Sequence, residues 1–179
     1  MKENMQAGFT YTVESFVGSE FDSDGRLVRL GEVAGKTVTP NLMPLEGLNR
    51  MLEILLRDGT KVATWYLMLY ENDYLPQSTD TMALFPGLAG EITEYAGATR
   101  PPIVFDAPDG GQCSNITNRN LVTFLVPKTV RGGAVCSSPT KGSGSGVLIS
   151  AARFSSPKPI DMEDPVLRVT VGFGFVSTS

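Results

Sequence analysis

Leu167 to Phe175 has the sequence LRVTVGFGF, in which leucine, valine or phenylalanine alternates with arginine, threonine or glycine. Successive side chains of a β-strand point to opposite faces, so this alternation is typical of a strand with one buried face. The pattern predicts a strand over Val166 to Val176. The apolar residues of LRVTVGFGF would face a core, and the remaining ones would face away from it.

Upstream, Ala63 to Tyr70 has the sequence ATWYLMLY, which is apolar on both faces. A strand of this kind is expected to be covered on both sides. A helix is predicted before it, from about Pro44 to Asp58, with Pro44 at the first position and Gly59 as the C-terminal cap. Its apolar stripe consists of Leu45, Leu48, Met51, Leu52, Leu55 and Leu56. We expect this stripe to contact the core and the helix to cover one face of ATWYLMLY.

Short β-like segments separated by turn signals fill most of the remaining chain. They are Phe9–Val17, Arg26–Leu30, Lys36–Thr39, Glu91–Tyr95, Ile103–Phe105, Leu121–Val126, Val130–Cys136 and Val147–Phe154, with a helical turn at Asp80–Phe85. The pattern predicts a mostly β fold, an antiparallel β-sandwich or jelly-roll-like domain with one amphipathic helix.

The expected organisation is an extended N-terminal arm with short strands over residues 1–40 and a β-sandwich domain over residues 41–179. The arm would either lie on a neighbouring subunit or pack on its own domain. The segment from Ser137 to Gly146 is rich in glycine and serine and is expected to form a flexible hairpin tip. Together with the polar loop from Glu71 to Gln77, it would be a prominent surface feature.

Composition excludes several classes of function. The formal charge of -4 and the absence of adjacent basic residues argue against broad nucleic-acid binding. No apolar run approaches the roughly 18 residues of a membrane span, and the N-terminus lacks the apolar core of a signal peptide, so we expect synthesis in a cytoplasm. Charged residues make up 19% of the chain, a low share that favours a surface partly buried against partners.

The sequence contains few residues of the types that enzymes use for catalysis. The chain has no histidine, which excludes Ser-His-Asp and Cys-His nucleophile systems and histidine-based metal sites. Cys113 and Cys136 are the two cysteines, and they form no CxxC motif. Free, partly buried thiols are the favoured interpretation in a reducing compartment, with a disulfide between neighbouring strands as the alternative.

Paired carboxylates could still hydrolyse a glycosidic bond, and the candidates are Glu91, Glu94, Asp106 and Asp109. Their spacing singles out no pair, so solvated acids on loops or strand edges are the simpler interpretation. The sequon Asn115-Ile116-Thr117 is interpreted as accidental. No catalytic, cofactor-binding or metal-ligating residue is therefore predicted, and no small-molecule substrate.

Five segments together resemble a group of small structural proteins of tailed bacteriophages. They are GLNRMLEILL, TWYLMLYENDY, STDTMALFPGLAGEITEYAGATRPP, ITNRNLVTFLVPKTVRGGAVCSS and LISAARFSSPKPI. The shared pattern is a helix, an aromatic TWY strand, a DTMA segment, an E-x-x-x-Y-x-x-x-x-R-P stretch and a terminal β region. Glu91, Tyr95, Arg100 and Pro101 supply the fourth element. The resemblance covers roughly residues 40 to 176.

This resemblance implies a virion protein that is not an enzyme. Within that class, size and β-content favour a capsid decoration (cement) protein on the outside of the capsid. Its partners would be the major capsid protein and further copies of itself, as a dimer or trimer. A tail or head–tail connector component is the main alternative, and a polysaccharide hydrolase is a distant third.

Overall fold

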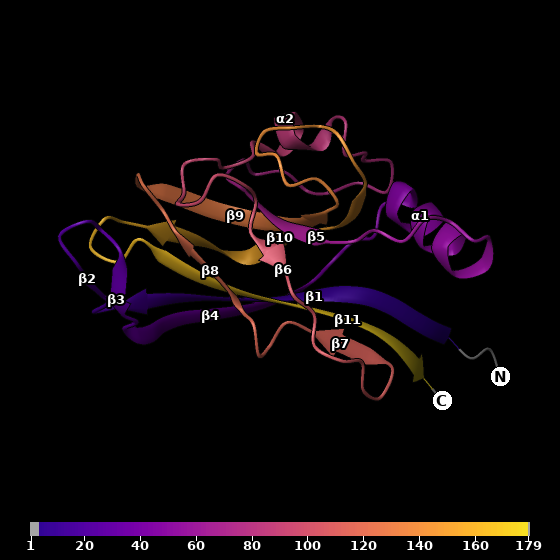
Figure 1. Cartoon of the computed structure of the whole chain (residues 1–179), viewed down its shortest axis with the longest axis horizontal. Helices are drawn as coiled ribbons and strands as arrows, with labels where there is room; N and C mark the ends of the chain where they lie inside the picture. The colour runs from indigo at the N-terminus through magenta and orange to yellow at the C-terminus, as the bar shows by residue number, and fades with distance from the viewer. Residues whose placement is uncertain (1–3, 179) are drawn as a thin grey trace.

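Two antiparallel sheets pack face to face in the computed structural model, which describes residues 4–178 (Figure 1). The elements in chain order are β1 (Asn4–Val17), β2 (Glu20–Phe21), β3 (Leu27–Arg29), β4 (Glu32–Pro40), α1 (Leu45–Leu56), β5 (Trp65–Tyr70), α2 (Phe85–Ala89), β6 (Pro102–Ile103), β7 (Gln112–Ser114), β8 (Asn120–Thr123), β9 (Lys128–Cys136), β10 (Leu148–Ile160) and β11 (Val166–Thr178). The prediction of a mostly β, sandwich-like fold is confirmed.

Sheet I has the strand order β4-β1-β11-β7, with β8 also paired to β11. Sheet II has the order β10-β9-β5-β6, and β2 pairs with β3 in a separate hairpin. The register between β1 and β11 runs without interruption from Asn4↔Thr178 to Ser15↔Leu167. The first and the last strand of the described chain therefore lie side by side in the middle of sheet I (Figure 1).

This arrangement decides between the two interpretations of residues 1–40, as far as the structure describes them. β1 pairs with β11 and β4, and Tyr11 and Val13 of β1 are completely buried. The segment thus packs on its own domain and supplies two strands of the sandwich, so residue 40 does not separate an arm from a domain. Residues 1–3 lie outside the described residues.

The main core fills the space between the sheets. Leu167, Val169 and Val171 of β11 are fully buried there, as the alternation in LRVTVGFGF predicts. They meet Leu67 and Leu69 of β5, which face them from sheet II. Since each fully buried side chain of this size is worth about 1.5–3 kcal/mol, this layer dominates the stability of the fold.

A second, smaller core covers the other face of sheet II. Met68 and Tyr70 point into it from β5, so the prediction that ATWYLMLY is covered on both sides is confirmed. The prediction that the helix before the strand covers one of these faces is wrong, however. The outer face of β5 is covered by α2 and the turn that precedes it. Phe85 of α2 packs edge-on against Tyr70, with ring centroids 5.7 Å apart. α1 instead contacts β10.

The segment from Glu91 to Tyr95 is not the strand that the sequence predicts. Glu91 makes a single bridge to Tyr70 of sheet II, and Tyr95 makes one to Phe124, just beyond β8 of sheet I. The segment crosses from one sheet to the other, so it has a different partner at each end and forms no continuous ladder.

The loop from Ser137 to Gly146 does not project as a hairpin tip. It folds over Arg100, which is fully buried and forms an ion pair of 2.6 Å with Glu91. Arg100 also donates hydrogen bonds to the carbonyl oxygens of Ser138 and Ser143, at 3.0 and 2.9 Å. The loop has few apolar side chains, and it is held in place by these hydrogen bonds to the buried guanidinium.

Candidate functional site

α1 exposes the leucines that were expected to contact the core. Their exposed fractions are 53% for Leu45, 38% for Leu48, 53% for Leu52, 64% for Leu55 and 75% for Leu56. We call these five residues the leucine ridge. Single exposed leucines are ordinary, but a contiguous apolar patch on one helix is typical of an interaction surface.

Gly47 explains why the helix packs in this orientation. It is the buried residue of α1, and a Cβ there would lie 2.7 Å from both the Cα atom and the carbonyl oxygen of Ile149 on β10. The helix therefore approaches the strand along the line of Gly47, Met51 and Ile54, the two larger residues being partly buried. At 100° per residue, the leucine ridge lies to one side of this line, facing away from the core.

An apolar groove of about 300 Å³ adjoins the leucine ridge. Met51, Ile54 and Leu55 of α1 form one wall. The other lining residues are Phe9, Lys61, Val62, Trp65, Phe105, Cys113, Ile149, Phe173 and Phe175. Leu55 belongs to both features, so the leucine ridge and the groove form one continuous apolar surface.

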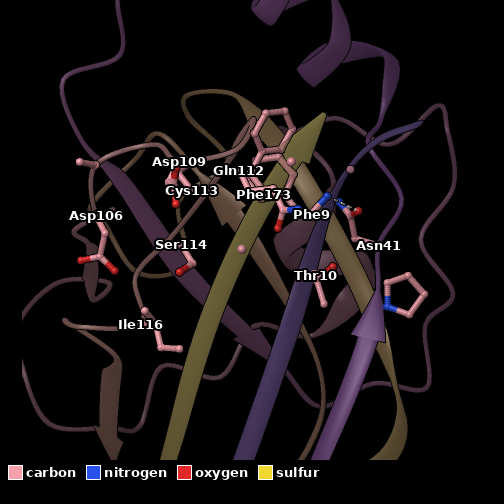
Figure 2. A pocket seen from close by; sticks show the side chains of 15 residues that line it. Phe9, Thr10, Asn41, Asp106, Asp109, Gln112, Cys113, Ser114, Ile116 and Phe173 are labelled. Atoms are coloured by element: carbon pink, nitrogen blue, oxygen red, sulfur yellow. Dashed lines mark hydrogen bonds between the residues drawn. The ribbon is translucent and has the colours of Figure 1, made fainter. Parts of the chain in front are cut away.

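A second hollow, of about 860 Å³, lies on the outer face of sheet I, and Figure 2 shows the residues that line it. Gly8 of β1 and Gly172 and Gly174 of β11 contribute its floor, so we call it the glycine trough. In Figure 2, Asp106, Ser114 and Ile116 lie on one side of β1 and β11, and Asn41 lies on the other.

A tight hairpin shapes one wall of the glycine trough. Asp109 and Gln112 exchange backbone hydrogen bonds of 2.8 and 2.9 Å, and both intervening glycines have positive φ angles, 54° at Gly110 and 78° at Gly111. Two glycines with positive φ are what a type I′ turn requires. β7 follows this turn directly and pairs with β11.

Of the four carboxylate candidates, Asp106 and Asp109 line one hollow, whereas Glu91 and Glu94 have basic partners elsewhere. Glu91 is held by Arg100, and Glu94 pairs with Lys128 at 3.3 Å. Asp106 and Asp109 both line the glycine trough, but Thr117 donates hydrogen bonds to Asp106. These bonds lower the pKa of Asp106, and backbone hydrogen bonds lower that of Glu94. A glycosidase needs a general acid with a raised pKa, the opposite shift.

Neither cysteine resembles an activated nucleophile. Both are free, with Cys113 partly buried in sheet I and Cys136 buried behind sheet II. Burial raises the pKa of both thiols, whereas a reactive cysteine needs a lowered one. Asn115 of the sequon is also fully buried, and its amide donates to the Asn120 side chain at 3.0 Å. A glycosylating enzyme could not reach it in the folded protein.

Within residues 4–178, no cluster of three or more cysteine, aspartate or glutamate side chains could hold a metal ion. No helix in this part of the chain is long and apolar enough to cross a membrane. Comparison with protein-family models gives no match, and comparison with curated proteins gives none either. Two surface features stand out on the described residues: the leucine ridge with the groove beside it, and the glycine trough.

Proposed function

We propose that the protein is a non-enzymatic structural protein of a tailed-phage particle, which binds the outside of the capsid as a decoration (cement) protein. The observation that carries this proposal is the leucine ridge, together with the groove beside it. A virion protein is also what the five sequence segments resemble. The sandwich gives the ridge a rigid support, because α1 is anchored against β10 at Gly47.

The physical contribution of the leucine ridge can be bounded. Its five leucines are between 38% and 75% exposed, so covering them is worth on the order of 5 kcal/mol before the cost of association. One such contact alone gives modest affinity. Several copies engaged at once on a capsid lattice bind far more tightly, which is how a small protein reinforces contacts between major capsid subunits.

The test uses capsids that lack the protein, to which purified protein is added back. We expect Leu52→Ser combined with Leu55→Ser to abolish cosedimentation with capsids and the protection of particles against heat. Leu75→Ser combined with Leu84→Ser is the matched control, since these leucines are 61% and 63% exposed outside the ridge. The control variant should bind like the wild type.

Two outcomes would contradict capsid decoration. The ridge variant could bind and protect capsids as well as the wild type, which would remove the ridge from the mechanism. Alternatively, immunogold labelling of native particles could place the protein only on the tail or at the head–tail junction, which would establish the connector or tail alternative instead.

A further inference from the structure

The groove beside the leucine ridge lies where the main core is left open. Four apolar side chains pack against this core but are only partly buried, and all four line the groove: Met51, Trp65, Phe105 and Phe173. They come from α1, from both sheets and from the segment after β6, at the end of the sandwich beside α1 (Figure 1). The described chain therefore leaves its own core uncovered at this end.

A row of phenylalanine rings leads from the core into the groove. The rings of Phe9 and Phe173 lie 4.7 Å apart between centroids, and Phe173 meets Phe175 edge-on at 5.0 Å. Phe9 is 6% exposed, whereas Phe175 is 41% exposed. Among the described residues, Phe175 pairs with no ring besides Phe173. Because aromatic rings favour offset and edge-to-face contacts with one another, a ring from a partner would extend this row.

The charge at the groove has one sign. Among the described residues, Lys61 is the one charged residue that lines it. Lys61 is exposed, and none of the ion pairs within residues 4–178 includes it. A carboxylate of a partner would meet this ammonium group, whereas a basic side chain would be repelled by it. Opposite charges at an interface fix its orientation and exclude wrong partners.

The size of the groove limits its occupant to a side chain. Its volume of about 300 Å³ is at the small end of the range for ligand sites. The central contacts of protein interfaces have this form, with one large side chain in a pocket and a surround of weaker contacts that excludes water. Leu55 belongs to both the groove and the leucine ridge, so one partner surface would cover both.

We infer that the groove receives one aromatic anchor side chain of the major capsid protein, with an aspartate or glutamate next to it. The inference rests on the proposed function, because it gives the chemistry of the partner of that same surface. The anchor ring packs against Phe175 and Trp65, and the neighbouring carboxylate pairs with Lys61. The leucine ridge covers the apolar surface around the anchor, so the groove and the ridge have the capsid as their one partner.

The first experiment uses Trp65, which is the chain's one tryptophan and lines the groove, so its fluorescence reports on occupancy in the purified protein. The probes are N-acetyl-phenylalanine, its uncharged amide, and N-acetyl-alanine, which lacks the ring. We expect N-acetyl-phenylalanine to shift the emission of Trp65 saturably and N-acetyl-alanine to leave it unchanged. The amide should bind about two- to fivefold more weakly, the effect expected of an exposed ion pair.

Two variants separate the contribution of the ring from that of the charge. Val62→Phe places a ring of the chain's own in the groove and should abolish the saturable shift, whereas Val104→Phe, at a site 56% exposed outside the groove, should leave it intact. Lys61→Met should make the acid and the amide bind equally. Lys36→Met removes an exposed cation outside the groove and should preserve the difference. Circular dichroism confirms that each variant is folded.

The second experiment identifies the anchor on capsids that lack the protein. Val62→Phe should weaken cosedimentation about tenfold or more, whereas Val104→Phe should bind like the wild type. Phe175 is then replaced by the photoreactive p-benzoylphenylalanine. After irradiation on capsids, mass spectrometry should find it joined to a capsid peptide in which an aromatic residue has an acidic neighbour.

The outcomes separate the anchor from the proposed function. If N-acetyl-phenylalanine leaves Trp65 unchanged up to its solubility limit, or if the cross-linked capsid peptide has no aromatic residue beside an acid, the anchor is overturned. Capsid decoration still stands in that case when the wild type coats capsids and the ridge variant does not. A chain that binds N-acetyl-phenylalanine as described but does not bind capsids would support the chemistry of the groove and overturn capsid decoration.

Discussion

At the scale of single residues, Arg100 does more for the structure than any pattern in the sequence indicates. It is fully buried, and it joins Glu91 to the carbonyl oxygens of the loop from Ser137 to Gly146. The backbone amide of Gly142 donates to Glu91 at 3.0 Å and closes the network from the loop side. A loop with hardly any apolar side chain is thereby held in place by charge-assisted hydrogen bonds.

We expect Arg100→Met to lower the free energy of unfolding by about 3–5 kcal/mol, because it leaves the buried carboxylate of Glu91 without its partner. The double variant Arg100→Met with Glu91→Gln should cost clearly less, since it removes both charges. Urea denaturation followed by tryptophan fluorescence measures both. Equal losses in the two variants would mean that the ion pair itself is unimportant.

At the scale of elements, the position of α1 depends on one small residue. Gly47→Ala should lower the free energy of unfolding by roughly 1–3 kcal/mol, although alanine is the better helix former, because its Cβ would clash with the backbone of β10. Gly87→Ala in α2 is the matched control: a Cβ there meets nothing within 4 Å, so it should be neutral or slightly stabilising. Thermal melting measures the stability of both variants. A stability change of the same sign and size in the two would contradict the role given to Gly47.

The elements also show where sequence patterns suffice and where they do not. LRVTVGFGF and ATWYLMLY were predicted correctly as strands, since alternation and a two-sided apolar run depend on local geometry alone. Phe175 is the exception on the apolar face of LRVTVGFGF, because it is 41% exposed rather than buried in the core. The stripe of α1 was assigned to the core wrongly, because periodicity gives an apolar face but not the surface that it meets. The glycine trough escaped prediction because it requires the register of β1 against β11, two segments far apart in the chain.

At the scale of the whole molecule, carboxylates tie distant segments together and make stability depend on pH. Burial raises the pKa of Glu14, but its hydrogen bond and charge pairing with Arg168 outweigh this and lower it. Asp164 behaves alike: burial raises its pKa, but backbone hydrogen bonds from Ser19 and Gly18 together outweigh burial and lower it. These contacts link β1 to β11, and the turn between β1 and β2 to the loop before β11.

The pKa values of Glu14 and Asp164 are lower in the folded chain than in the unfolded chain, where they are about 4. The stabilisation by these two carboxylates is therefore complete above about pH 4, and it is lost as the pH falls through their folded-state pKa values. We expect the free energy of unfolding to be flat near neutral pH and to decline below about pH 4. Glu14→Gln combined with Asp164→Asn should make that decline shallower, as measured by urea titrations across the acid range. An unchanged slope would show that other carboxylates dominate.

The pairing of β1 with β11 has a consequence for biosynthesis. Among the described strands, β1 is translated first, and β11, its neighbour in the middle of sheet I, is translated last. Until β11 emerges, the nascent chain cannot close its main core, and β1 remains without one of its two partners. Folding that depends on such distant pairing is slow, and an unpaired strand edge is prone to aggregation until its partner emerges.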